Sequence, residues 1–248
     1  MAKIEILSGF HACLALIERY PERILEVFIQ QDKSSDRAAP IVALAKQHSL
    51  PVQEISRKKL DDKTEGASHQ GICLRYRPQQ AETENALISS LEDVSQSTLF
   101  LILDSITDPH NLGACLRSAD AAGVDGVIIA KDKSVGLTPA VRKVACGAAE
   151  SVPFYQVTNL ARCLGYLKDA GVFVVGTALS DKAHVIYQSN FKAPTALVMG
   201  AEDKGLRRLT AELCDELVYL PMSGSVQSLN VSVATGVCLF EVVRQRQV

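Results

Sequence analysis

The chain of 248 residues contains 47% hydrophobic residues and has a formal net charge of −2, so it can form one large domain or two smaller domains with their own cores. No apolar stretch approaches the roughly 18–20 residues of a membrane-spanning helix, and residues 1–14 lack the basic and then apolar pattern of a signal peptide. We therefore expect a cytoplasmic protein with no membrane partner. The small net charge gives no global sign of a nucleic-acid partner.

Residues 1–80 show the alternating pattern of a small α/β domain. Helices are predicted at 11–20 and 39–49, and extended segments at 24–30, 52–56 and 71–78. Basic side chains gather in SRKKL (56–60) and RYR (75–77), where Tyr76 stands between two arginines. Such a cluster is either a solvated face or a phosphate-binding surface with an aromatic ring for stacking. We interpret residues 1–80 as a candidate substrate-binding domain.

Residues 81–98 read AETENALISSLEDVSQST, which is polar and contains four acidic residues and no basic residue. This composition, between two segments of different pattern, predicts a linker and a domain boundary. The stretch at 84–94 is also compatible with a short helix.

From residue 99 onward, predicted strands alternate with predicted helices, which is typical of a mainly parallel sheet covered on both faces. Ligands of such sheets bind beyond the carboxyl ends of the strands. Three polar loops follow predicted strands, at 104–113, 200–208 and 221–230. The predicted strands are 99–103, 126–130, 172–178, 195–200 and 216–222, and the predicted helices are 112–123, 158–171 and 228–246.

Common catalytic motifs are missing from these loops. The sequence has no Gly-x-Gly-x-x-Gly, no Gly-x-Ser-x-Gly and no His-Glu-x-x-His, and the segment from Gly200 to Gly205 continues as Leu-Arg instead of the P-loop Lys-Ser/Thr. No metal site is therefore expected. The seven cysteines form no Cys-x-x-Cys pair, which favours buried free thiols in a reducing compartment.

What remains in the loops and the helices that follow them is a set of amide, hydroxyl, carboxylate and guanidinium groups, which suits positioning and electrostatic stabilisation. The set is Asn111, Arg117, Glu202, Ser228 and Asn230. Ser228 and Asn230 precede the last helix, so each could cap that helix or contact a ligand. In residues 231–243 nearly every position is small or apolar all around the helix. Such a helix is buried, either centrally or by a second subunit, and we favour a dimer interface.

Three segments carry a resemblance to a known family. NLGACLRSADAAG (111–123), LVMGAEDKGLRRL (197–209) and LPMSGSVQSLNVSVATGVCLFE (220–241) resemble, in order, the motifs of the SpoU-type branch of the SPOUT RNA methyltransferases. The likeness extends through VRKVACGAAESVP and VTNLAR, and the stretch GFHACLALIE resembles the start of the family's substrate-binding domain. It is nearest to the bacterial members that methylate a guanosine 2′-hydroxyl in 23S ribosomal RNA.

The resemblance implies an α/β methyltransferase domain over 99–248 whose C-terminal segment forms a trefoil knot, preceded by the small domain of residues 1–80. It also implies S-adenosylmethionine as methyl donor, 23S ribosomal RNA as partner and a homodimer. The residues that would hold the donor are Gly200, Leu220 and Leu229, with Thr177 and Met222 as neighbours. The five polar residues of the loops fall on the family's catalytic motif positions.

The proton acceptor for the 2′-hydroxyl can be interpreted in two ways. From ordinary pKa values alone, Glu202 or His110 would accept the proton, because an arginine with a pKa above about 12 is normally protonated. The resemblance points instead to Arg117 as base, assisted by the substrate phosphate. The planar fork of an arginine also suits a phosphate clamp, and under either role Glu202 and Asn111 would orient Arg117 and the ribose.

Two positions depart from the family pattern, since Ser105 and Asp203 stand where relatives usually have glycine. Asp tolerates the left-handed backbone region better than most residues, so activity should survive. Two alternative functions are the same chemistry on transfer RNA and a non-catalytic rRNA-binding or ribosome-assembly factor. Intact Arg117, Glu202 and Asn230 argue against a mere RNA-binding protein.

Overall fold

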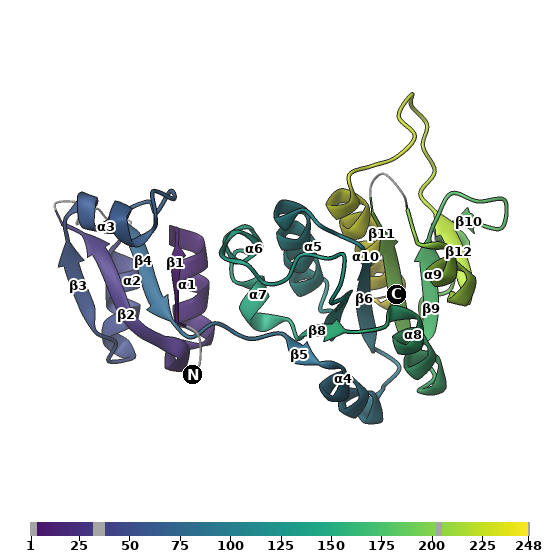
Figure 1. The fold of residues 1–248 in the computed structure, drawn as a ribbon, viewed down its shortest axis with the longest axis horizontal. Helices are drawn as coiled ribbons and strands as arrows, with labels where there is room; N and C mark the ends of the chain where they lie inside the picture. The colour runs from purple at the N-terminus through teal and green to yellow at the C-terminus, as the bar shows by residue number, and fades with distance from the viewer. Residues whose placement is uncertain (1–3, 32–37, 202–204, 248) are drawn as a thin grey trace. The chain divides into compact units, whose positions relative to one another are not determined.

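The computed structural model describes residues 4–31, 38–201 and 205–247, and the chain forms two compact units (Figure 1). The first unit contains Met1–Gln80 and Leu137–Ser151, and the second contains Ala81–Gly136 and Val152–Val248. The segment 137–151 therefore packs with the first unit, although the sequence pattern grouped it with residues 99–248.

The first unit is built on a four-stranded sheet of order β1-β4-β2-β3. β1 and β2 are antiparallel to β4, and β3 is parallel to β2. Several of its elements were not predicted, namely β1, η1, α3, α6 and α7. The elements are β1 (Glu5–Ser8), α1 (Phe10–Arg19), η1 (Pro21–Arg23), β2 (Ile24–Gln30), α2 (Ala39–Gln47), β3 (Val52–Ile55), α3 (Arg57–Lys63), β4 (Ile72–Tyr76), α6 (Pro139–Ala145) and α7 (Ala148–Ser151).

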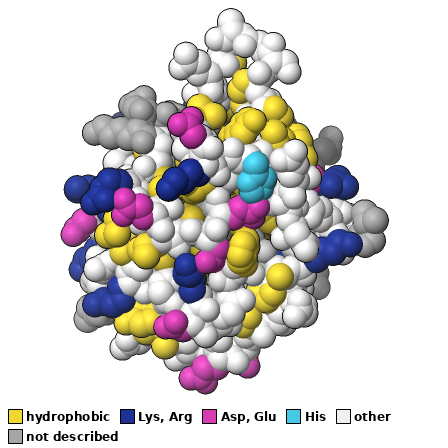
Figure 2. Space-filling model, turned by 90° about the vertical axis from the view of Figure 1, so that its right-hand side faces the viewer, with side chains coloured by type: hydrophobic (Ala, Val, Ile, Leu, Met, Phe, Trp, Pro, Cys, Tyr) yellow, Lys and Arg dark blue, Asp and Glu magenta, His cyan; other side chains and the backbone are white. Residues whose placement is uncertain are grey.

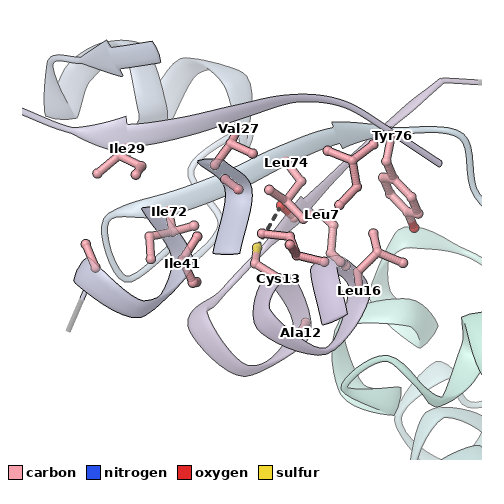
Figure 3. Packing of buried hydrophobic residues seen from close by; sticks show 14 residues of the cluster. Leu7, Ala12, Cys13, Leu16, Val27, Ile29, Ile41, Ile72, Leu74 and Tyr76 are labelled. Atoms are coloured by element: carbon pink, nitrogen blue, oxygen red, sulfur yellow. Dashed lines mark hydrogen bonds between the residues drawn. The ribbon is translucent and has the colours of Figure 1, made fainter. Parts of the chain in front are cut away.

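The core of this unit lies between the sheet and helices α1 and α2 (Figure 3). α1 buries the face that carries Cys13, Leu16 and Ile17, because residues three and four positions apart share one side of a helix. Ile41 of α2 and Leu74 of β4 are likewise fully buried. The helix predicted at residues 11–20 is thus confirmed as α1.

Tyr76 contributes to this core and is only 1% exposed. Its hydroxyl donates a hydrogen bond of 3.1 Å to Glu150 Oε1. The predicted stacking role for Tyr76 is therefore wrong, because the ring has no free face to offer a base. Of the same basic cluster, Arg75 is exposed and pairs with Glu26 at 3.6 Å.

The second unit begins with residues predicted as a linker. They form β5 (Glu82–Thr83), α4 (Glu84–Ser90) and η2 (Leu91–Asp93). Leu87 of α4 is fully buried in the core of this unit, and the Thr83 hydroxyl caps α4 by accepting a hydrogen bond from the Ala86 amide. Ala86, Leu91 and Val94 pack against the same cluster. The segment predicted as a linker is therefore part of the second unit, because its few apolar side chains share one core.

An eight-stranded sheet of order β10-β12-β9-β11-β6-β7-β8-β5 organises the second unit, and all of its strand pairs are parallel. The predicted parallel sheet is confirmed. α4 and α8 pack on a common apolar cluster against it, while α5 and α10 pack on each other. The remaining elements are β6 (Leu99–Asp104), α5 (Pro109–Ala121), β7 (Gly126–Ala130), β8 (Phe154–Val157), α8 (Leu160–Asp169), β9 (Phe173–Thr177), β10 (His184–Val185), η3 (Ile186–Gln188), β11 (Thr195–Gly200), α9 (Arg208–Leu213), β12 (Glu216–Tyr219) and α10 (Val231–Arg246).

The composition of α10 predicted a helix buried on all sides, either within the chain or by a second subunit. Within the chain, α10 is buried on one side only. Its buried side contacts α5, where Cys115 Sγ donates to Thr235 Oγ1 at 3.5 Å. Val233, Val237 and Phe240, which follow one another along one side of the helix, are 52%, 38% and 50% exposed. Among the helices of residues 4–31, 38–201 and 205–247, none is long and apolar enough to cross a bilayer.

Candidate active site

The carboxyl ends of β6 and β11 lie side by side, since Asp104 and Gly200 are register partners at the end of the two strands. The Asp104 carboxylate is fully buried. It accepts hydrogen bonds from Arg207 Nε at 2.6 Å and from the Arg207 amide at 3.1 Å. This ion pair fastens the loop after β11 to the end of β6, and a buried pair of this kind depends on good geometry.

Neither Asp104 nor Arg207 was singled out from the sequence. The available signal was an acidic residue that closes the otherwise apolar strand LFLILD. Ser105 follows with φ of 68° and donates from its hydroxyl to Asp104 Oδ1 at 3.0 Å. This left-handed backbone explains why glycine is the usual family residue there. Asp203, the other departure, lies outside the described residues.

Gly200 stands where only glycine fits. A Cβ there would lie 2.2 Å from the carbonyl carbon of Gly205 and 2.4 Å from the Leu206 nitrogen. Ala201 and Gly205 exchange two backbone hydrogen bonds of 3.1 and 2.8 Å, which bring the two ends of the loop together. Glu202 belongs to this loop and lies outside the described residues.

The first and third predicted motifs meet at Asn111 and Asn230. Asn230 Nδ2 donates to Asn111 Oδ1 at 2.9 Å. Asn230 also caps α10, because its Oδ1 accepts from the Ser232 amide at 3.0 Å. Asn230 therefore fills the capping role that the sequence left open, and its contact with Asn111 joins the first and third motifs. A ligand role for Asn230 stays a prediction. Ser228 is exposed in the preceding loop.

Arg117 is exposed on α5. It is six residues beyond Asn111, which places the two positions about 120° apart around the helix axis. α5 itself begins with a capped turn, in which Asp108 Oδ1 accepts from the His110 amide at 2.9 Å. His110 is exposed at this first turn.

The residues expected to hold a donor molecule surround the same edge of the sheet. Thr177 at the end of β9 donates from its hydroxyl to the Val198 carbonyl at 3.1 Å, so it ties β9 to β11. Leu220, Met222 and Leu229 are half-buried in the segments that flank the loop after β12. Half-buried apolar side chains of this kind can pack against a flat heterocycle.

A cavity of about 450 Å³ opens at this edge and was not anticipated. Its walls include Ala130 at the end of β7, Asn159 at the start of α8, and Arg207 and Leu209 beside α9. Within the described part of the chain, no group of three or more His, Cys, Asp or Glu side chains could hold a metal ion.

The seven cysteines are free, and five of them are buried. Burial raises the pKa of Cys163, Cys214 and Cys238 to about 12. The expected buried free thiols are confirmed, and these three are thiols and not nucleophilic thiolates at neutral pH.

Two family models match consecutive parts of the chain. The model described as RNA 2′-O ribose methyltransferase substrate binding matches residues 6–82, and that of the SpoU rRNA Methylase family matches residues 98–240. The parallel sheet with its three loops is thus a methyltransferase fold, and the chain belongs to the SpoU rRNA methylase family.

Named relatives match the chain along its whole length. The 23S rRNA (guanosine-2′-O-)-methyltransferase RlmB of Shewanella oneidensis is 54% identical over 247 residues, with 100% of both chains covered. The enzyme of the same name from Escherichia coli K12 is 53% identical and covers 98% of this chain and 99% of its own. Among solved structures, an AdoMet-bound rRNA methyltransferase from Sinorhizobium meliloti is 26% identical, with a TM-score of 0.74 over 97% of this chain and 87% of its own.

Proposed function

We propose that this protein transfers a methyl group from S-adenosylmethionine to the 2′-hydroxyl of a guanosine in 23S ribosomal RNA. The observation that carries this proposal is the 54% identity, over both full lengths, to a relative named for that reaction. The site supports it, because its groups suit orientation of two substrates and lack the motifs of hydrolysis or metal catalysis. We place the reaction in the cytoplasm, where ribosomal RNA is made.

The residues at the sheet edge fit the donor. Gly200 leaves no space for a side chain beside Gly205, so the chain there offers only backbone amides and carbonyls. Leu220, Met222 and Leu229 supply apolar surface, and a bound S-adenosylmethionine would supply an electrophilic methyl group. Thr177 holds the end of β9 beside β11 through its hydrogen bond to the Val198 carbonyl, at the edge where the donor would bind.

The chain's own polar groups would position the ribose and remove its proton. The Asn111–Asn230 hydrogen bond fixes the distance between the start of α5 and the start of α10. A fixed distance between these two segments favours a reproducible geometry for in-line attack. Arg117 either accepts the 2′-hydroxyl proton or clamps the adjoining phosphate, and its exposure on α5 leaves it accessible to RNA. We assign Glu202 and Asn111 to the orientation of Arg117 and the ribose, and Ser228 to a contact with the ligand.

We infer a homodimer formed through α10. The stripe of Val233, Val237 and Phe240 would otherwise expose three large apolar side chains in water. On the face of the second unit seen in Figure 2, further hydrophobic side chains gather at the base of the projecting loop. A second copy can cover the stripe of α10 with its own, as in an isologous interface. Light scattering should show a dimer at micromolar concentration and a monomer for Phe240→Glu; a monomeric parent protein would contradict this.

We also propose that the C-terminal segment is knotted. β11 lies between β6 and β9, the chain then continues to β12 beyond β9, and α10 returns to pack on α5, which follows β6. This return path is compatible with threading through an earlier loop, an arrangement that ordinary folds avoid. An experimental chain trace that comes free when both ends are pulled would contradict the knot.

Methylation mapping tests the function directly. The 2′-O-methyl groups of ribosomal and transfer RNA should be compared in cells with and without this gene, with an Arg117→Ala gene as the matched control. One guanosine of 23S ribosomal RNA should lose its methyl group. Loss of a methyl group on a transfer RNA would mean that the substrate is transfer RNA and not 23S ribosomal RNA. Loss of no methyl group on either RNA would contradict the proposed reaction. Calorimetry in the presence of a chelator should still show donor binding, because we expect no metal.

A further inference from the structure

The first unit contains a cavity of about 660 Å³ that is separate in sequence from the methyl-transfer residues. It is lined by Phe10 at the start of α1, Gln30 at the end of β2, Arg57 of α3, and residues 66–72 ahead of β4. Its size lies within the range of pockets that bind small molecules and cofactors. The core of the unit does not require such a cavity.

The wall formed by residues 66–72 is held in a defined conformation. His69 is 7% exposed, and its Nδ1 accepts from the Gly71 amide at 2.9 Å while Nε2 lies 3.0 Å from Asp61 Oδ1. Since Nδ1 accepts, the hydrogen is on Nε2 and points to Asp61. Gln70 has φ of 53°, and its Oε1 accepts from the Phe10 amide at 3.0 Å. Sparsely populated backbone held by surrounding bonds is typical of binding sites.

Positive charge is placed beside this cavity against the usual helix preference. Ser56 caps α3, and the first turn then carries Arg57, Lys58 and Lys59, all exposed. Acidic residues are favoured at a helix N-terminus, and cations there are unfavourable. Arg57 Nε lies 3.9 Å from Asp61 Oδ2, and Asp61 also lines the cavity. The Arg57 side chain is nevertheless 76% exposed, and Lys58 and Lys59 are exposed beside it. An anion on the rim of the cavity would account for them.

We propose that this cavity binds one unstacked nucleotide of the substrate RNA. The Phe10 ring offers a face for the base, the side-chain amides of Gln30 and Gln70 can pair with its polar edge, and Arg57 receives the adjoining phosphate. Unstacked bases held on aromatic rings are the usual mode of sequence-specific RNA recognition, whereas a duplex does not enter a concave pocket. The proposal rests on the proposed function only in taking RNA as the ligand.

Binding by the full-length protein tests this assignment separately from catalysis. An unmodified 23S ribosomal RNA transcript is measured by filter binding over a salt series, with Phe10→Leu, Arg57→Gln and the control Lys46→Gln. Lys46 is an exposed cation at the end of α2 and is not part of the cavity wall. Phe10→Leu keeps apolar volume in a residue that also packs on the core.

We expect Phe10→Leu to weaken RNA binding about tenfold, since stacking of one base on an aromatic ring has an effect of this size. Arg57→Gln should lower the slope of log affinity against log salt by about 0.7–0.9, which corresponds to one phosphate contact. Lys46→Gln should change neither. In methyl-transfer assays both cavity variants should raise the KM for RNA and leave kcat and donor binding unchanged.

Wild-type RNA affinity in both cavity variants overturns the assignment, as does an equal effect of Lys46→Gln. Binding of free mononucleotides at micromolar concentration, competing with RNA poorly, would identify the cavity as a nucleotide site unrelated to RNA and would also overturn it. If the wild-type protein binds the transcript but transfers no methyl group, the proposed function fails while the cavity assignment still stands on the binding data.

Discussion

Charged and polar side chains are used differently in the two units. In the first unit, Glu150 is 2% exposed and binds four partners. Its Oε1 accepts from Tyr76 and Arg142, and its Oε2 accepts from the Gln79 amide at 2.7 Å and from Arg23 at 3.4 Å. In the second unit, Arg117 is exposed in the second half of α5, and Asn230 is exposed at the start of α10.

The buried Glu150 network and the exposed polar residues of the second unit are expected to serve different purposes, the first stability and the second function. A carboxylate with all of its lone pairs engaged by the protein has nothing left to offer a ligand, and its role is to hold segment 137–151 against residues 1–80. The exposed guanidinium of Arg117 is expected to add little to stability, because solvent-exposed charges contribute little to the free energy of unfolding. We therefore expect mutations around Glu150 to affect unfolding and mutations at Arg117 to affect turnover.

The largest expected effect is on catalysis. Arg117→Ala should lower methyl transfer by about 10²–10⁴-fold, the usual range for loss of a group that moves a proton in the transition state. Donor binding by calorimetry should be nearly unchanged, because the predicted donor residues lie in the other two motifs. Arg19→Ala is the control, since Arg19 is an exposed arginine in the last turn of α1, outside the three motifs. Near-normal turnover of Arg117→Ala would show that the proposed active site is wrong.

The next effect is on the free energy of unfolding. Glu150→Ala should destabilise the protein by about 3–5 kcal/mol, because it leaves the buried Arg142 without its main anionic partner. Glu212→Ala, which breaks an exposed pair, should cost less than about 1 kcal/mol. Urea unfolding measures both, and turnover per folded molecule should not change. An equal loss of unfolding free energy in Glu150→Ala and Glu212→Ala would contradict the stabilising role assigned to the buried Glu150 network.

A smaller effect should divide the two roles of Asn230. Asn230→Ser keeps a capping oxygen for α10 but is too short to reach Asn111, so stability should change by only a few tenths of a kcal/mol. Methyl transfer should nevertheless fall. Asn230→Ala should lose both activity and about 1 kcal/mol of stability. Full activity in the serine variant would assign Asn230 to capping alone.

The smallest effect concerns pH. Burial raises the pKa of Cys238 from an ordinary value near 9 to about 12. An unfolded chain therefore loses this proton above about pH 9 while the folded chain keeps it, so the contribution to stability is complete below pH 9 and is lost as pH rises toward 12. Unfolding at pH 8 and at pH 10.5 should show a smaller decrease for Cys238→Ala than for the parent. An identical decrease would mean that the thiol is not shielded.

Deletion of residues 1–80 is a poor test of RNA binding by the first unit. Residues 137–151 would remain in such a chain. Glu150 would lose Tyr76, Arg23 and the Gln79 amide as partners, and Arg142 would lose the Gln79 carbonyl. Loss of RNA binding could then follow from unfolding. Point substitutions at the cavity avoid this difficulty.

Local pattern was sufficient for much of the molecule. Strands such as 99–103 and 126–130 are short apolar runs, and helices such as 11–20 and 158–171 show one apolar side, so hydrophobic period alone placed them. The motifs that contain Asn111, Gly200 and Asn230 indicate the family from their residues alone. The short strand β8 and the helices α6, α7 and α9 were missed because each has too few residues to show a hydrophobic period.

The sequence by itself determined the parallel sheet, the order of the motif loops and the identity of the polar residues, because these depend on neighbours in the chain. Only the tertiary structure decided that Tyr76 is a core residue bound to Glu150, that Arg207 seals the end of β6 at Asp104, and that α10 exposes one apolar side. These pairings join residues 74 and 103 positions apart. Which distant groups meet depends on how whole elements pack, and periodicity within one element contains no information about that.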